Sequence, residues 1–352
     1  MKYRNLLDYL PKNDIPETIC EECRLNGDSI YGTCARCLRN QAKITEYVET
    51  HAFIVDDCIM DYHNGSCNHD LLKATPLREP DERPRLFYGI ELEVSFEDAG
   101  ISFSDIAREF AEITNGIAVF ERDGSVDDGF EIIFRPMSKR RAYREFGKGG
   151  AVRKGLEYLE QQGADICQPS GNGIHIHISK NFFRAGSESI NHYGSEMNWL
   201  FQVFQPQLEQ LCGRKYYHYC QGAKKIAEDR LTGGVFGDIV FEGARLKKGN
   251  DIPYDDHGVA FNERSATYEA RIFHSTINPD TILSYIEIMS NFAHTVRDGD
   301  PHDKTLDEIL HQEDNLYLDK HIKKCRNREF KNGNKATIEL KATNKDEIKL
   351  GV

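Results

Sequence analysis

The chain has 352 residues, of which 39% are hydrophobic and 29% charged, and its formal net charge is -12 at pH 7. This length allows one substantial buried core, and the acidic balance argues against a nucleic-acid-binding surface that covers the whole molecule. No stretch approaches the roughly 20 apolar residues that cross a bilayer, and the start of the chain lacks the apolar core of a secretory signal, so we expect a cytoplasmic protein without membrane partners.

Six of the ten cysteines lie in the first 67 residues. Two CxxC elements supply four thiolates, Cys20, Cys23, Cys34 and Cys37, at a spacing that suits one tetrahedral Zn²⁺. Such an ion would stabilise a segment that is too small for a core of its own. We therefore predict that residues 1–82 form a structural zinc module with a linker, the alternative being ordinary free thiols.

A second group of metal-type side chains follows the CxxC pair with irregular spacing: Cys58, His63, Cys67 and His69. These residues form either a second zinc site or part of an exposed loop. The linker after them, 76–85, is rich in proline and charge, and it is expected to be extended.

The main domain is expected over residues 83–300, with strands and helices interleaved. The patterns predict strands at 86–96, at AVFERD and FEIIF around the turn DGSVDDG, and at GIHIHIS. The segment VAFNERSATYEARIF is expected to form two strands or one bent strand. They predict helices over SDIAREFAEIT from an N-cap at Ser104, over most of 140–162, over 190–211 with a break at Pro206, and from Asn278–Pro279 onward. A polar helix and tail are expected over 301–352. The fold class is α+β, with a mainly antiparallel sheet, flanking helices and one sheet face open to a ligand.

Three pairs of polar residues are each separated by one apolar residue: Glu91 and Glu93, His175 and His177, and Glu269 and Arg271. In a strand, residues spaced by two share a face, so each strand would have one apolar face and one face that carries the polar side chains. Glutamate and histidine are metal ligands, and arginine binds phosphate or carboxylate. The three strands together predict a site for cations and a polyanion.

Other residues extend this predicted site. Asp123 and Glu131 lie near the ends of two strands joined by a turn, where both could face the same cavity. Arg264 and Lys180 are candidate phosphate contacts, with solvated charges as the alternative. Arg135 either binds a substrate carboxylate or forms a surface ion pair.

The combined motifs resemble the phage and bacterial amidoligase family, which belongs with glutamine synthetase and glutamate-cysteine ligase. The resemblance rests on YGIELEV at 88–94, DGSVDDGFEI at 123–132, SGNGIHIHIS at 170–179 and TYEARIFHSTINPDT at 267–281, in the order of the family. These motifs span most of the main domain. A glutamine synthetase-like catalytic domain preceded by a small zinc module is the fold that this resemblance implies.

The resemblance implies an ATP-dependent carboxylate-amine ligase that forms an amide or isopeptide bond through an acyl phosphate. Phosphoryl transfer of this kind uses two divalent cations, Mg²⁺ or Mn²⁺, held by carboxylates, together with cationic groups. By resemblance, one ion would be held by Glu91, His175 and Glu269, and the other by Glu93, Asp123 and Glu131. His177 would contact nucleotide phosphate or metal, and Arg271 would neutralise the transferring phosphoryl group. The predicted catalytic residues are Arg271, His177 and Glu93, and the predicted ATP contacts are His177, Arg271, Arg264 and Lys180.

The sequence departs from the family in three places. Many members have Cys-Gly before the HxH strand, where this chain has Asn172-Gly173, and Ala270 stands where a bulky residue is usual. Arg135 stands where a histidine or a small polar residue often precedes the proline. The expected partners are a carboxylate and an amine, carried by an amino acid, a peptide or a protein side chain. If a phage encodes the chain, its location is the host cytoplasm.

Two other functions remain open at this point. His175, His177 and Glu269 could instead form a zinc or non-haem iron site of a hydrolase or oxygenase, which leaves four carboxylates without a role. The chain could also be a non-catalytic binding protein on a ligase scaffold. No predicted metal ligand is replaced by an apolar residue, which weighs against a lost activity.

Overall fold

The computed structural model describes the chain in two compact units, Met1–Asn181 with Ser275–Ile282, and Phe182–His274 with Leu283–Val352. The described residues are 59–60, 76–96, 102–124, 126, 128–165, 172–185, 190–214, 260–264, 266–299, 301 and 304–326. The predicted zinc ligands Cys20, Cys23, Cys34 and Cys37, and the group Cys58, His63, Cys67 and His69, lie outside these residues. The zinc module therefore stays a prediction.

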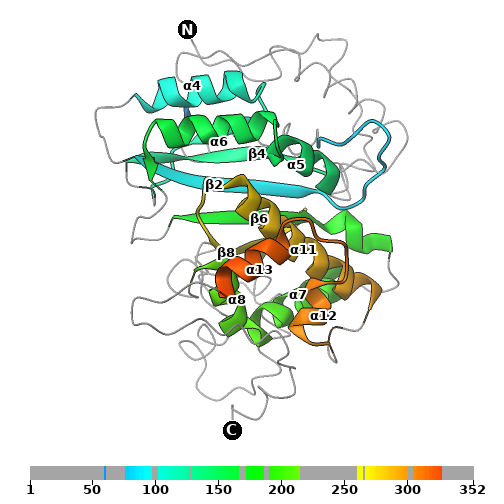
Figure 1. Ribbon diagram of the computed structural model, residues 1–352. Coiled ribbons are helices and arrows are strands. Elements are labelled where there is room, and N and C mark those ends of the chain that lie inside the picture. Colours follow the sequence, from blue (N-terminus) through cyan, green and yellow to red (C-terminus); the bar gives the residue numbers. More distant parts are fainter. Residues whose placement is uncertain are drawn as a thin grey trace, which may run out of the picture. The chain divides into compact units, whose positions relative to one another are not determined.

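The first unit is an α+β structure built on a mainly antiparallel sheet (Figure 1). Within the described residues its strand order is β1-β3-β4-β2-β6, and β5 pairs with the end of β2. The β1–β3 pair is parallel, and the other pairs between these strands are antiparallel. The strands are β1 (Ile59–Met60), β2 (Tyr88–Phe96), β3 (Ala118–Glu121), β4 (Gly129–Met137), β5 (Ala164–Asp165) and β6 (Gly173–Ser179).

Three helices cover one face of this sheet: α4 (Phe103–Ile113), α5 (Lys139–Phe146) and α6 (Ala151–Gln161) (Figure 1). Helix α4 begins two residues earlier than expected. Its N-cap is Ser102, whose hydroxyl accepts the Asp105 backbone N–H, so the predicted cap at Ser104 was wrong.

The single helix predicted over 140–162 is two helices. Gly149 has a φ of +83°, in the left-handed region that favours glycine. A Cβ on Gly150 would lie 2.1 Å from the Glu145 carbonyl oxygen. The chain therefore turns between α5 and α6, which lets both helices pack on the same sheet.

The core of the first unit lies between the helices and the apolar sheet face. Phe110 of α4 packs edge-on against Phe120 of β3 and against Phe134 of β4, with ring centroids 5.9 and 6.2 Å apart. Phe120 also meets Phe130 at 5.8 Å. Each fully buried phenylalanine contributes roughly 1.5–3 kcal/mol, so this cluster fixes which face of the strands points to the helices.

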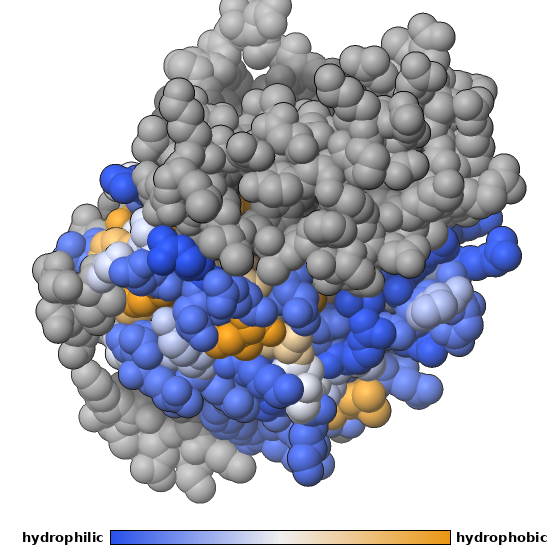
Figure 2. All heavy atoms as spheres, turned by 90° about the horizontal axis from the view of Figure 1, so that it is seen from above, coloured by the Kyte–Doolittle hydropathy of each residue, from blue (hydrophilic) through white to orange (hydrophobic). Residues whose placement is uncertain are grey.

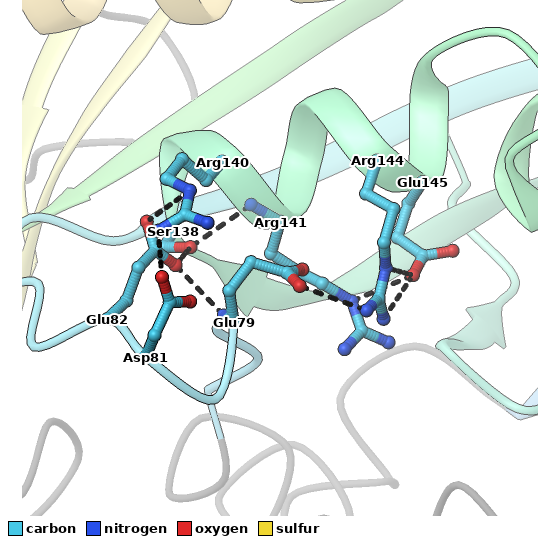
Figure 3. Close-up of polar contacts among 8 residues, drawn as sticks. All are labelled: Glu79, Asp81, Glu82, Ser138, Arg140, Arg141, Arg144 and Glu145. Atoms are coloured by element: carbon cyan, nitrogen blue, oxygen red, sulfur yellow. Dashed lines mark hydrogen bonds and ion pairs between the residues drawn. The ribbon is translucent and has the colours of Figure 1, made fainter.

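The segment 76–85, predicted as an extended linker, is anchored to the first unit. Leu77 is fully buried and exchanges backbone hydrogen bonds with the end of β4, to the Pro136 carbonyl and from the Ser138 N–H, at 2.7 and 2.8 Å. Figure 3 shows its acidic side chains turned toward the arginines of α5. The ion pairs Asp81–Arg140 and Glu79–Arg144 have N–O distances of 3.0 and 3.1 Å.

The second unit contains a β-hairpin and several helices. Strands β7 (Phe261–Glu263) and β8 (Thr267–His274) are antiparallel. Helices α7 (Ile190–Val203) and α8 (Gln205–Cys212) divide beside Pro206, as predicted from the sequence. The remaining elements are α12 (Leu306–Leu310), α13 (Leu318–Arg326), and two that cross the boundary between the units, the 3₁₀ helix η3 (Lys180–Ala185) and α11 (Pro279–Asp298).

The beginning of α11 confirms the prediction of a cap at Asn278 followed by Pro279. The Asn278 side-chain oxygen accepts the Thr281 backbone N–H at 3.1 Å. Within the segment 301–352, where a polar helix and tail were expected, residues 306–326 contain two helices with buried side chains. Helix α12 has a capping box made by Thr305 and Glu308, and Leu318, Ile322 and Cys325 of α13 are buried.

The described surface is mainly polar. On the face seen in Figure 2, the described atoms are mostly hydrophilic, with only small hydrophobic areas. Among the described residues, Leu316 is the large hydrophobic side chain that is exposed. None of the described helices combines the length and the apolar character that a membrane span requires.

Candidate metal centre

The sheet of the first unit has an apolar face and a polar face, as the alternation in the sequence predicts. In β2, Ile90, Leu92 and Val94 are buried, and the intervening positions are Glu91 and Glu93. Successive side chains of a strand point to opposite faces, so both carboxylates lie on the side away from the aromatic core.

The strand register brings polar residues of neighbouring strands opposite one another. Glu91 of β2 faces His175 of β6, and Glu93 of β2 faces Glu131 of β4. Glu131 is also opposite Glu121 of β3. Residues directly opposite in an antiparallel pair have Cβ atoms about 4.5–5.5 Å apart, so these side chains are immediate neighbours.

The Glu91 carboxylate contacts both histidines of β6. Its Oε2 lies 3.1 Å from His175 Nδ1, and its Oε1 lies 3.0 Å from His177 Nε2. His177 has room on this face because the residue opposite is Gly89, where a Cβ would lie 3.3 Å from the His177 Cβ. The predicted ExE and HxH pairs are therefore brought together.

Glu91, Glu131 and His175 form a candidate metal-binding group. Each offers one ligand atom, and these atoms all lie within 4.8 Å of one another. Two carboxylate oxygens and one imidazole nitrogen suit a divalent cation such as Mg²⁺, Mn²⁺ or Zn²⁺. The resemblance to amidoligases implied a different ion for Glu131 than for Glu91 and His175, whereas in the structure ligand atoms of the three side chains lie in one group.

Glu93 is oriented beside this group by the residues around the HxH strand. Its Oε2 accepts the Gly173 backbone N–H at 2.6 Å, and its Oε1 lies 3.5 Å from His175 Nε2. Its main-chain carbonyl accepts the Ser275 hydroxyl at 2.6 Å. Asn172 donates to the Ser95 hydroxyl at 2.8 Å, so the Asn-Gly sequence links β6 to β2.

The two central carboxylates have opposite electrostatic environments. Burial works to raise the pKa of Glu91, but the nearby charge and hydrogen bonds of His177 and His175 outweigh it and hold that pKa well below its usual value. Burial raises the pKa of Glu131 well above its usual value, and the negative charges of Glu91, Glu93, Asp123 and Glu121 add to the effect. A divalent cation would relieve this repulsion.

Comparison with models of known protein families gives no match, and comparison with curated protein sequences gives none either. The resemblance to amidoligases therefore rests on the four motifs alone.

Glu269, Arg271 and Arg264 form a cluster within the second unit. Glu269 is fully buried, and its Oε1 accepts from Arg271 Nη1 at 2.8 Å while its Oε2 accepts from Arg264 Nε at 2.7 Å. Asn262 donates to the same Oε2 at 3.3 Å. One carboxylate thus orders two guanidinium groups, a set of cationic donors that suits phosphate or carboxylate.

The three remaining predicted site residues, Asp123, Lys180 and Arg135, belong neither to the metal group nor to the Glu269 cluster. Asp123 is half-buried and lies beyond the end of β3, close enough for its charge to act on Glu131. Lys180 is largely buried at the start of η3. Arg135 of β4 is fully buried, which contradicts its alternative role in a surface ion pair.

Sequence reasoning missed Glu121. It lies at the end of β3 and is almost fully buried, next to Glu131 on the neighbouring strand. The alternation of Ala118, Val119, Phe120 and Glu121 could have placed it on the polar face. Its partner could not be inferred, because that requires the register of the β3–β4 pair.

Proposed function

We propose that the protein is an ATP-dependent carboxylate-amine ligase with a divalent-cation centre on the polar face of the first unit. The observation that carries the proposal is the group of Glu91, Glu131 and His175, whose ligand atoms lie within 4.8 Å of one another. The α+β sheet with helices on one face and these side chains on the other supports a glutamine synthetase-like domain.

The proposed activity uses this centre to bind the triphosphate. A bound Mg²⁺ or Mn²⁺ supplies positive charge for the phosphate oxygens. Glu91, Glu131 and His175 would hold it, and Gly173 would keep Glu93 in position through the backbone N–H. The number of carboxylates on this face, which also includes Glu121, favours more than one cation.

Transfer of a phosphoryl group to a carboxylate also requires cationic donors for the charge that develops on oxygen. Arg264 and Arg271, which Glu269 orders, have the chemistry of such donors. Arg271 is the better candidate for the transferring group because it is almost fully buried, whereas Arg264 is one-third exposed. The resulting acyl phosphate would be attacked by an amine, with release of phosphate.

The alternative hydrolase or oxygenase would use His175, His177 and one carboxylate around zinc or iron. The contacts of both histidines with Glu91 are compatible with such a site. It gives no role to Glu93, Glu121 or Glu131, which are all buried on the same face. A non-catalytic binding protein gives no role to the buried like charges either.

The proposal is tested by measuring ADP release with pooled amino acids and peptides, in Mg²⁺ and in Mn²⁺. The wild-type chain is compared with Glu93→Ala and with Glu112→Gln, a control on the exposed surface of α4. We expect ADP release that one pool stimulates, that Glu93→Ala abolishes and that Glu112→Gln retains. Turnover of a substrate without ATP, supported by Zn²⁺ or Fe²⁺, would favour the alternative enzyme. Neither ATP hydrolysis nor stabilisation by ATP with Mg²⁺ would indicate a non-catalytic protein.

A further inference from the structure

Glu121 lies on the same polar face as the candidate metal group, but the proposed function assigns it no specific task there. It is the last residue of β3, is 1% exposed and lies directly opposite Glu131. Glu131 in turn lies opposite Glu93. Three carboxylates thus form one row across β3, β4 and β2, and the middle one belongs to the candidate metal group.

The strand geometry determines which way Glu121 points. The preceding residue, Phe120, packs against Phe110 of α4 and Phe130 of β4 on the apolar face. Since neighbouring side chains of a strand alternate, the Glu121 side chain lies on the polar face with Glu131. It cannot turn to the other face without removing Phe120 from the aromatic core.

A carboxylate in this row acts on the metal group in two ways. Its negative charge adds to the attraction for a cation, and this attraction is stronger in a buried site than in water. It also occupies the space beside Glu131, which limits the directions in which the Glu131 side chain can turn. Outer residues of this kind commonly change metal affinity by about 10–100-fold.

We propose that Glu121 is a positioning residue of the metal centre, which strengthens divalent-cation binding by the group of Glu91, Glu131 and His175. The inference rests on the metal centre of the proposed function and adds a residue that the family motifs do not include. It also distinguishes Glu121 from Asp123, which is less buried and lies outside the strand.

The test is Mn²⁺ binding to the full chain, measured by electron paramagnetic resonance of free Mn²⁺ and by calorimetry, without nucleotide. Four proteins are compared: the wild type, Glu121→Gln, Glu121→Asp and the surface control Glu112→Gln. We expect a dissociation constant about tenfold higher for Glu121→Gln. Glu121→Asp keeps the charge and should stay within about threefold of the wild type, and Glu112→Gln should be unchanged.

Equal Mn²⁺ affinity of the wild type and Glu121→Gln would overturn the inference. Equal losses in Glu121→Gln and Glu121→Asp would also overturn it, because they would indicate packing rather than charge. Both results are compatible with the proposed metal centre. If the proposed metal centre is itself wrong, the wild type binds no Mn²⁺ and all four proteins behave alike.

Discussion

Glu131 and Glu287 are both buried carboxylates, one in each unit, and their neighbours are opposite in kind. Glu287 of α11 is fully buried and accepts backbone N–H groups from Leu316, Tyr317 and Leu318, at distances from 2.6 to 3.2 Å. These donors lie at the N-terminus of α13, where unpaired N–H groups and the helix dipole favour a negative charge. Glu131 instead lies among other carboxylates.

The comparison shows that burial of a carboxylate does not by itself indicate function. Glu287 holds the loop before α13 to α11, and its charge is balanced by donors that the fold supplies. Glu131 is in a site where the fold supplies more negative charge, which destabilises the protein without a ligand. A carboxylate whose pKa is raised by burial and by other carboxylates is a candidate for a binding site, and this is the basis on which we propose a role for Glu131.

The largest effect is expected from Glu287→Ala. The substitution leaves three backbone N–H groups without their acceptor, and each buried unpaired donor costs about 1–3 kcal/mol, so the free energy of unfolding should fall by roughly 3–5 kcal/mol. Urea denaturation measures this change. Glu287→Gln retains one acceptor oxygen and should lose less. A fall below about 1 kcal/mol for the alanine variant would remove the distinction between the two carboxylates.

The next effect concerns the metal group itself. Glu91→Gln removes a charge that would be a direct ligand, so we expect Mn²⁺ affinity to fall by at least about 100-fold, beyond the range seen for outer residues. Calorimetry measures it, with Glu112→Gln as the matched control. Unchanged Mn²⁺ affinity in the Glu91 variant would place the ion elsewhere.

Glu131→Gln should change stability in the direction opposite to Glu287→Ala. Since the folded state raises the pKa of Glu131, the wild-type protein is most stable, with respect to this group, below the usual value of 4.5 and loses that stability as pH rises through the raised pKa. The glutamine variant does not ionise there. In the absence of metal it should be more stable at pH 7 by roughly 1 kcal/mol, with no advantage near pH 4.

Thermal denaturation between pH 4 and pH 8, with a chelator present, tests the Glu131 prediction. The same variant should gain less stability than the wild type when Mn²⁺ is added, because it has lost a ligand. A glutamine variant that is less stable than the wild type at pH 7 would show that Glu131 is balanced by donors, as Glu287 is.

The smallest effect is expected at the anchored segment of Figure 3. Asp81 is exposed, and the arginine beside it, Arg140, holds the pKa of Asp81 below its usual value. Exposed ion pairs are screened by solvent, so Asp81→Asn should not change the denaturation midpoint measurably. A clear shift of the midpoint would mean that the segment contributes more to the fold than its exposure indicates.

Local sequence patterns were sufficient to predict the strands of the candidate site, their polar face and the start of α11. The alternation in YGIELEV and GIHIHIS predicted the strands that carry Glu91, Glu93, His175 and His177, and Asn278 with Pro279 predicted the start of α11. These features depend on residues close in sequence. The sequence predicted one helix where the structure has α5 and α6. The turn between them depends on the conformation of Gly149 and on the close contact at Gly150, which the sequence pattern does not give.

Features that depend on pairing between distant residues could not be predicted in the same way. The place of Glu121 follows from the register of β3 against β4, and the role of Glu287 follows from a contact with residues about 30 positions later. The shared carboxylate of Arg264 and Arg271 depends on the β7–β8 hairpin. In each case the sequence contains an ordinary glutamate, and only its neighbours in space distinguish it.

The central claim is that Glu91, Glu131 and His175 bind one divalent cation. It is tested most directly by a crystal structure of the Mn²⁺-soaked protein, with anomalous diffraction data that locate manganese. We predict an anomalous peak about 2.0–2.2 Å from an oxygen of Glu91, an oxygen of Glu131 and a ring nitrogen of His175. Manganese bound elsewhere, with these three side chains unchanged and in contact with one another, would contradict the claim.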